Sequence, residues 1–278
     1  MRIITDSAAD FTHAELAKYG VRCVFTQVVF GSEAFTPGVD LSAEAFWQRL
    51  LADEIAKTSQ PSPEAFLKEF EAAKAANEEA VYVGLSSGVS GTFQSAKMAA
   101  DMCGWSGIHL VDTLTGTAAQ KLLALHACLM RDLGKTAAEI AATLERMRSR
   151  VKLFASLDTL EYLARSGRIP KALAGLGALT QLKPLLEVSP DGRITLGGKA
   201  FGRHRAIEGL AKRIASFKMD SAHPIIPLYS YCANNCQALL HKLAALGINI
   251  SCEPCAIGPS IAPHIGPNAY GMVFVEAE

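Results

Sequence analysis

Short apolar runs alternate with longer amphipathic segments along the first half of the chain. Strands are predicted at Ile3–Ile4, Cys23–Phe30, Val81–Leu85 and Ile108–Val111. The segments between and after them predict helices at about residues 11–19, 42–51, 63–76, from 90–92 onward, 115–133 and 136–150. Residues 57–63 are expected to form a polar loop, because two prolines interrupt them. This alternation favours a parallel sheet that helices cover on both faces.

The second half of the chain follows a different pattern. Strands are expected at residues 152–156, 225–231, 248–255 and 272–275, with a hairpin formed by 185–188 and 194–196. Helices are expected at residues 159–165, 172–182, 204–217 and 235–246. We therefore predict two α/β domains, residues 1–152 and 153–278, with a parallel sheet in the first and a mixed or antiparallel sheet in the second.

Composition and charge argue against several classes of protein, among them nucleic-acid-binding and membrane-bound proteins. The 278 residues are 50% apolar, and 27 basic residues balance 27 acidic ones, so no net charge attracts nucleic acid or a membrane surface. The N-terminus runs directly into a strand without an apolar leader, and the most apolar helical segment is interrupted by charges. Seven scattered cysteines suit reduced thiols better than a disulfide framework. A cytoplasmic protein without a membrane segment is expected.

The segment Val81–Met98 carries the clearest chemical signal. An apolar strand enters a loop that contains Ser86, Ser87 and Ser90, and a helix follows. Two glycines in this loop allow close approach of the backbone, while hydroxyls and the helix start donate hydrogen bonds. This combination indicates a site for an oxyanion. Serines that only cap the helix are the alternative interpretation.

The same loop also fits the pattern GxSxG of serine hydrolases, since Gly84 and Gly88 flank Ser86. A triad would need an acid and a histidine, for which Asp112 or Asp158 and His264 follow in the required order. A serine esterase or thioesterase is therefore the alternative function.

Two residues of the second half are further candidates. His264 lies in a rigid Pro/Gly segment, where its imidazole either bonds to backbone or meets an anion, which would make it charge more readily. Arg168 lies on an exposed turn and suits the carboxylate or phosphate of a partner. Four late cysteines are candidates for a zinc site, but their spacing favours small core residues; these are Cys232, Cys236, Cys252 and Cys255.

Five motifs in order resemble the DegV family of bacterial fatty-acid-binding proteins over essentially the whole chain. They are Ile4–Ser7, Lys57–Ser62, Leu85–Thr92, Leu160–Leu163 with Gly167–Ile169, and His264–Pro267.

The resemblance implies that a long-chain fatty acid such as palmitate lies in a tunnel between two α/β domains. Thr58 and Ser90 would bind its carboxylate, with His264 close by. Burial of about fourteen methylenes would contribute on the order of 10 kcal/mol before the costs of association. The segment 172–182 is a candidate tunnel wall.

The resemblance further implies a role as the lipid-binding subunit of a fatty-acid kinase. A separate ATP-using subunit would dock at Arg168, so the chain itself would not be an enzyme and would need no metal or cofactor. Three positions depart from the family pattern. Phe201 replaces a basic residue, Asn268 replaces a glycine and Tyr270 replaces an aliphatic residue. Phe201 bears on kinase docking, and the other two bear on the pocket near the carboxylate.

Overall fold

A computed structural model describes residues 1–170 and 181–278. The chain divides into two compact units, Met1–Ser149 and Arg150–Glu278, which are described separately. The predicted helix at 172–182 falls almost wholly outside the described residues.

Unit 1 is built on a parallel sheet with the strand order β2-β1-β6-β7. Its strands are β1 (Arg2–Asp6), β2 (Val21–Val24), β6 (Ala80–Gly84) and β7 (Ile108–Asp112). Its helices are η1 (Ser7–Ala9), α1 (His13–Tyr19), α2 (Ala43–Leu51), α3 (Pro63–Ala75), α4 (Thr92–Cys103), α5 (Thr117–Asp132) and α6 (Ala137–Met147). All pairings in this sheet are parallel, as the alternating pattern predicted.

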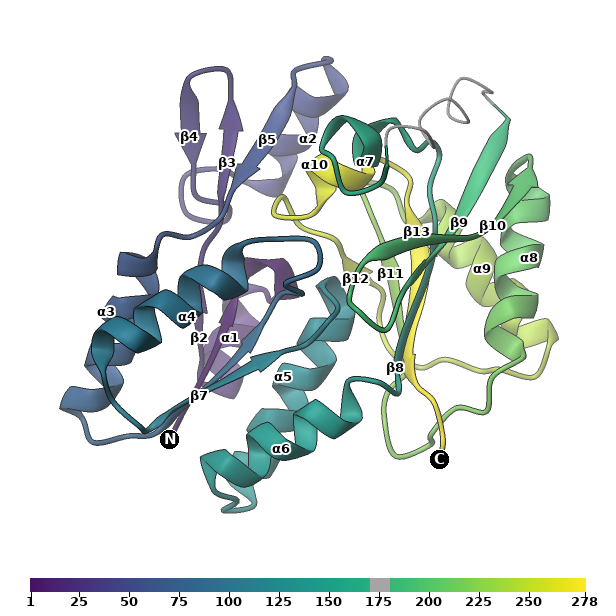
Figure 1. The fold of residues 1–278 in the computed structure, drawn as a ribbon. Coiled ribbons are helices and arrows are strands. Elements are labelled where there is room, and N and C mark those ends of the chain that lie inside the picture. Colours follow the sequence, from purple (N-terminus) through teal and green to yellow (C-terminus); the bar gives the residue numbers. More distant parts are fainter. Residues whose placement is uncertain (171–180) are drawn as a thin grey trace. The chain divides into compact units, whose positions relative to one another are not determined.

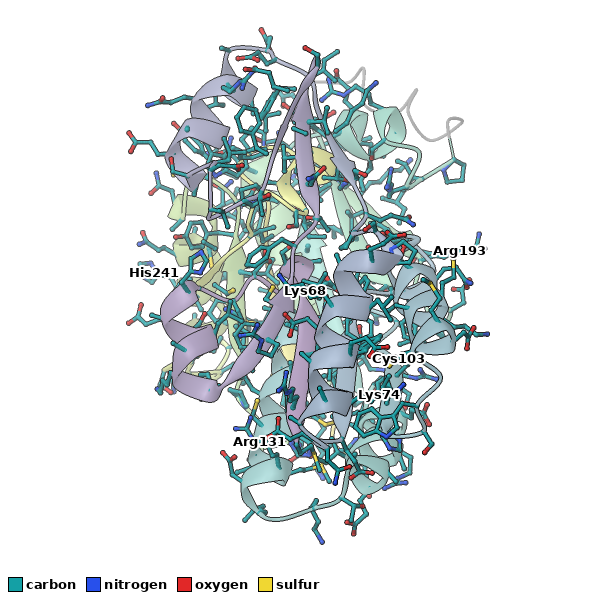
Figure 2. The ribbon with its side chains drawn as sticks, turned by 90° about the vertical axis from the view of Figure 1, so that its left-hand side faces the viewer. Lys68, Lys74, Cys103, Arg131, Arg193 and His241 are labelled. Carbon is teal, nitrogen blue, oxygen red and sulfur yellow. The ribbon has the colours of Figure 1, made fainter. Side chains whose placement is uncertain are left out.

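Helices cover both faces of the parallel sheet (Figure 1). Helices α3 and α4 pack side by side on one face, where Phe66 and Phe70 contact Ile4 and Tyr82 of the strands. Figure 2 shows Lys74 of α3 near the end of α4, where its ammonium donates a 2.8 Å hydrogen bond to the carbonyl of Cys103. Helices α5 and α6 pack against the same strands, so both faces of the sheet are buried.

A second, small sheet in unit 1 was not anticipated. It has the order β4-β3-β5, with β3 (Gln27–Phe30), β4 (Glu33–Phe35) and β5 (Ala56–Ser59). The single strand predicted at Cys23–Phe30 is therefore wrong, since two strands of different sheets occupy it. The loop predicted at 57–63 begins with a strand, because residues 56–59 pair with β3 although most of them are polar.

Unit 2 contains a mixed six-stranded sheet with the order β10-β9-β8-β13-β11-β12. Its strands are β8 (Val151–Ser156), β9 (Leu182–Val188), β10 (Ile194–Phe201), β11 (Ile226–Tyr229), β12 (Cys255–Ala256) and β13 (Tyr270–Val275), and its helices are α7 (Glu161–Arg165), α8 (Arg203–Ala215), α9 (Asn234–Ala245) and α10 (Ala262–Ile265). Among the described strands of this sheet, only the pairing of β11 with β12 is parallel. The long strand predicted at 248–255 is wrong, because only its last residue belongs to the two-residue strand β12.

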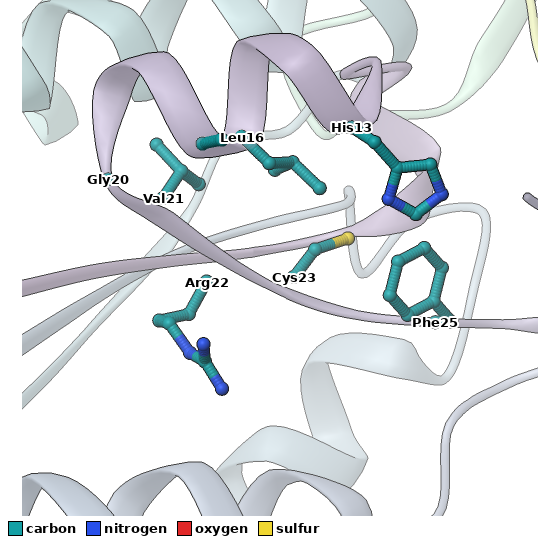
Figure 3. A pocket seen from close by; sticks show the side chains of 8 residues that line it. His13, Leu16, Gly20, Val21, Arg22, Cys23 and Phe25 are labelled. Carbon is teal, nitrogen blue, oxygen red and sulfur yellow. The ribbon is translucent and has the colours of Figure 1, made fainter. Parts of the chain in front are cut away.

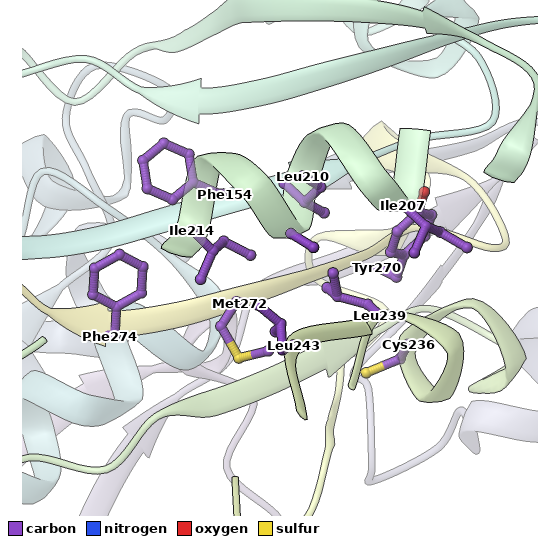
Figure 4. Close-up of a cluster of buried hydrophobic side chains, with 11 residues drawn as sticks. Phe154, Ile207, Leu210, Ile214, Cys236, Leu239, Leu243, Tyr270, Met272 and Phe274 are labelled. Carbon is purple, nitrogen blue, oxygen red and sulfur yellow. The ribbon is translucent and has the colours of Figure 1, made fainter. Parts of the chain in front are cut away.

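The core of unit 2 follows from the two-residue period of β13. Tyr270, Met272 and Phe274 point to one face of the sheet, where they meet the apolar stripes of α8 and α9 (Figure 4). Cys236 is fully buried in this cluster, as a small core residue would be. Cys232, Cys252 and Cys255 are only partly buried, so the prediction of core residues holds for one of the four cysteines.

Candidate oxyanion site

A fully buried carboxyl group lies beneath the Ser/Gly loop of unit 1. Asp6 ends β1 and accepts four hydrogen bonds. Its Oδ2 accepts from the Tyr82 hydroxyl at 2.7 Å, the Leu85 amide at 2.9 Å and the Gln120 side chain at 3.1 Å, and its Oδ1 accepts from the Ala8 amide at 3.1 Å. Burial raises the pKa of Asp6, and these donors oppose the rise. The carboxyl group thereby ties the start of the Ser/Gly loop to β1.

A second acid fixes the other side of this loop. Asp112 ends β7, and its carboxylate accepts from the amide of Ser87 at 3.2 Å and from that of Leu114 at 3.0 Å. Within the loop, the Ser86 hydroxyl accepts from the amide of Gly88 at 3.1 Å. The loop is therefore held from below by side chains at the carboxyl ends of two parallel strands, which is the usual edge for a ligand in such sheets.

Ser90 is the loop serine that best suits an incoming oxyanion. Its hydroxyl accepts from the backbone amide of Thr92 at 3.2 Å and lies 2.9 Å from the Thr92 hydroxyl. Ser90 is only partly buried, whereas Ser86 and Thr92 are completely buried. Gly91 is the N-cap of α4 and has no side chain to cap it. The donors available to an oxyanion here are therefore the hydroxyls of the neighbouring residues and the first backbone amides of α4.

The strand that carries Thr58 meets this loop. Thr58 lies on β5, and Gln60 follows directly after that strand. The Gln60 amide donates to the Ser95 hydroxyl at 2.9 Å, and a Cβ on Gly91 would overlap the Gln60 side chain. The end of the Gln60 side chain thus occupies the space that a side chain at position 91 would fill. The Lys57–Ser62 and Leu85–Thr92 motifs, which are far apart in sequence, are brought together in unit 1.

The other two candidates, His264 and Arg168, are neighbours in unit 2. Helix α7 packs against α10, and a Cβ on Gly266 would overlap the ring of Tyr162. Burial and the nearby positive charge of Arg168 lower the pKa of His264 to about 4. The imidazole is therefore neutral at pH 7 in this structure, and easier charging beside an anion remains a prediction.

Arg168 is less exposed than its turn suggested. Its side chain is partly buried, its guanidinium donates to the carbonyl of Ser166, and burial lowers its pKa. Among the described residues no carboxylate is paired with it, although the carboxylate of Asp158 in the same unit pairs with Lys183 at 2.8 Å. A partly desolvated guanidinium without an acidic partner suits an anion.

Asn268 and Tyr270, two of the departures from the family pattern, have a structural explanation. Asn268 has a φ of 61°, a left-handed conformation that asparagine tolerates better than most residues other than glycine. Its side chain donates to Asp158 at 3.0 Å. Tyr270 is buried in the core of unit 2. Phe201 is exposed at the end of β10.

Sequence reasoning missed one cavity of unit 1. It has a volume of about 410 Å³, within the range of ligand pockets, and lies between α1 and β2 (Figure 3). His13 and Leu16 line it from the helix, and Val21, Cys23 and Phe25 line it from the strand side. Burial raises the pKa of the Cys23 thiol well above its usual range, so this cavity does not hold a reactive thiolate.

The described residues contain no cluster of three or more histidine, cysteine or acidic side chains arranged to hold a metal ion. In the same part of the chain, no helix has the length and apolar character needed to cross a membrane.

Comparisons with known proteins place the chain in a family. Residues 1–277 match a family model described as "Uncharacterised protein, DegV family". The chain belongs to the DegV family. The DegV domain-containing protein YteA of Lactococcus lactis is 33% identical over 99% of this chain and 97% of that protein.

Solved structures of the family have the same fold. A DegV family protein of Thermus thermophilus, described as binding fatty acid, superposes with a TM-score of 0.87 and 29% identity, covering 100% of both chains. DegV of Bacillus subtilis, described as a fatty acid binding protein, gives a TM-score of 0.84 and 25% identity over 99% of both chains. These comparisons do not support the alternative of a serine esterase. Ser86 is completely buried, and Asp112 and Asp158 make other contacts.

The Asp6 network predicts the effect of removing its carboxyl group. Asp6→Ala leaves four donors without their acceptor, so we expect a loss of unfolding free energy of at least about 3 kcal/mol. Urea denaturation of the variant measures this loss. Asp132→Ala is the control, because Asp132 is exposed and should change stability by less than about 0.5 kcal/mol. Equal stability of the two variants would contradict the role of Asp6.

The pair formed by His264 and Arg168 predicts a dependence on pH. The unfolded chain protonates His264 near its ordinary pKa of about 6.5, whereas the folded chain does so near 4. Stability is therefore lost as the pH falls from 6.5 towards 4, and His264→Gln should lose less over this range. Arg168→Gln should raise the pKa of His264, measured by NMR of the imidazole. Arg165→Gln, three residues earlier at the end of α7, serves as the control and should leave the pKa of His264 unchanged. The interpretation fails if His264 titrates near 6.5 in the wild-type protein.

Proposed function

We propose that this protein binds a long-chain fatty acid and that Thr58 and Ser90 hold its carboxylate. The observation that carries the proposal is the convergence of β5 and the Ser/Gly loop at the edge of the parallel sheet, where Gln60 contacts both Gly91 and Ser95. The similarity over the whole chain to the fatty-acid-binding protein of Thermus thermophilus supports it.

The chemistry of the loop suits a carboxylate. Ser90 accepts a hydrogen bond from the Thr92 amide and shares a second with the Thr92 hydroxyl, in which either oxygen can donate. One of the two hydroxyl protons is therefore left for an incoming oxygen. A buried carboxylate needs several donors, and hydroxyls next to a helix start provide them without a buried cation. Asp6 and Asp112 keep the loop in place through its backbone, so the hydroxyls need little reorganisation when the ligand arrives.

His264 and Arg168 offer a second group of anion partners in unit 2. A neutral imidazole can donate to an oxyanion through one ring nitrogen, so His264 remains part of the proposal as a hydrogen-bond partner of the carboxylate. Arg168 carries the positive charge of the pair, and we assign it to a partner protein. That partner is an ATP-using subunit that phosphorylates the bound acid, so the chain would act as a carrier and not as an enzyme.

Single substitutions test the carboxylate contacts. Thr58→Val and Ser90→Ala each remove one hydroxyl, and loss of a hydrogen bond to a charged group should weaken binding of hexadecanoate at least about tenfold. Calorimetric titration of delipidated protein measures the affinity. Ser59→Ala and Ser87→Ala are matched controls, because each removes a hydroxyl from an exposed neighbour. Unchanged affinity in both test variants would refute the proposed contacts.

Substitution of Arg168 tests the partner. With saturating fatty acid, MgATP and a fatty-acid kinase subunit, Arg168→Ala should lower the rate of acyl phosphate formation at least about tenfold, since one charge-assisted contact is lost. Trapping the acyl phosphate with hydroxylamine measures the rate. Arg165→Ala is the control, because Arg165 stacks on Tyr162 and is exposed. Equal rates for Arg168→Ala and the wild-type protein would exclude this role.

A further inference from the structure

Three buried polar atoms at the start of α5 lack a hydrogen-bond partner among the described residues. They are the hydroxyl oxygens of Thr115 and Thr117 and Oε1 of Gln120. The two threonines are 6% and 7% exposed, and Gln120 is completely buried. By contrast, the Thr113 hydroxyl of the same loop donates to the carbonyl of Gly84 at 2.7 Å. Since the large majority of buried polar side-chain atoms are paired, three unpaired ones within six residues call for a ligand or a water molecule.

The helix start adds donors at the same place. Gly116 is the N-cap of α5 and has no side chain to cap it. The first amides bonded back to Gly116 are those of Ala119 and Gln120, so the amides of Thr117 and Ala118 precede the hydrogen-bonded turn. Thr117 and Gln120 both belong to the first residues of α5.

This helix start adjoins the Ser/Gly loop. The Ser86 amide donates to the carbonyl of Thr115 at 2.9 Å. A Cβ on Gly116 would lie 2.9 Å from a methyl carbon of Leu85. Both segments belong to unit 1, so a ligand group at Thr115 and Thr117 would lie close to the loop that we assign to the carboxylate.

The donors and acceptors define the group that fits. The Gln120 amide nitrogen lies 3.1 Å from Asp6 and 3.2 Å from the carbonyl of Val83, both acceptors, so the orientation of the amide is fixed and Oε1 must accept. An anion has no proton for Oε1, and a methylene chain pairs with none of these atoms. A hydroxyl group accepts from the threonine hydroxyls or the helix amides and donates to Gln120.

We propose that the first turn of α5 is a second polar subsite, which binds a hydroxyl group near the carboxyl end of the ligand. The ligand class is then a long-chain hydroxy fatty acid. This inference rests on the proposed function, because the Ser/Gly loop must hold the carboxylate next to the subsite.

Titration with three acids of equal chain length tests the subsite. They are hexadecanoic, 2-hydroxyhexadecanoic and 3-hydroxyhexadecanoic acid. At least one hydroxy acid should bind the wild-type protein about fivefold or more tightly than the plain acid, as one added hydrogen bond predicts. Thr117→Val keeps the branched shape at a position with a φ of 53° and should abolish this preference. Thr115→Val is the second variant if Thr117→Val fails to fold.

A threonine outside the subsite provides the control. Thr143→Val removes a hydroxyl of α6 that accepts from Arg146, and it should retain the preference. Tighter binding of the plain acid, or equal binding of all three acids by the wild-type protein, would overturn the subsite and leave buried water as the partner of these atoms. A preference that both threonine variants retain would also overturn it. If no acid binds, the proposed function itself fails.

Discussion

The Asp6 carboxyl group is the constraint on which the rest of the site depends. A carboxyl group without contact to water is tolerated only when nearly all of its acceptor positions are filled, and here the four donors come from three segments of unit 1. One of these donors is the first amide of the Ser/Gly loop, and another is the side chain of Gln120 on α5. These hydrogen bonds fix the start of the Ser/Gly loop and the first residues of α5 relative to β1.

The motifs group by unit. In unit 1, the Ile4–Ser7, Lys57–Ser62 and Leu85–Thr92 motifs meet through Asp6 and Gln60. In unit 2, the motif of α7 and the turn after it meets the His264 motif, where Tyr162 packs on Gly266 and the charge of Arg168 acts on His264. One group offers neutral hydroxyls and amides. The other offers a neutral imidazole and a partly buried cation.

The period of apolar residues was sufficient to predict the parallel sheet, its helices and the mixed sheet of unit 2. Prediction failed where tertiary pairing overrides local composition. Residues 56–59 are largely polar and precede two prolines, yet they form β5 because β3 supplies the pairing partner. The pattern at Cys23–Phe30 gives no sign that the chain changes sheets after Val24.

The sequence also identified Ser90, Arg168 and His264 as candidates, but not their electrostatics. Burial depends on segments far away in the chain, so the low pKa of His264 and the partial burial of Arg168 could not be read locally. The unpaired hydroxyls of Thr115 and Thr117 are a similar case. A threonine-rich helix start is common, and only the fold shows that these two side chains are buried.

We propose that the Ser/Gly loop held by Asp6 receives the carboxylate of a fatty acid. Carbon-13 NMR of hexadecanoate labelled at its carboxyl carbon observes that group directly. We expect one resonance for the bound acid, distinct from that of the free acid, which shifts in the Ser90→Ala variant and stays unchanged in Ser87→Ala. A bound resonance that Ser90→Ala leaves in place, or the absence of any bound resonance, would refute the proposed carboxylate site.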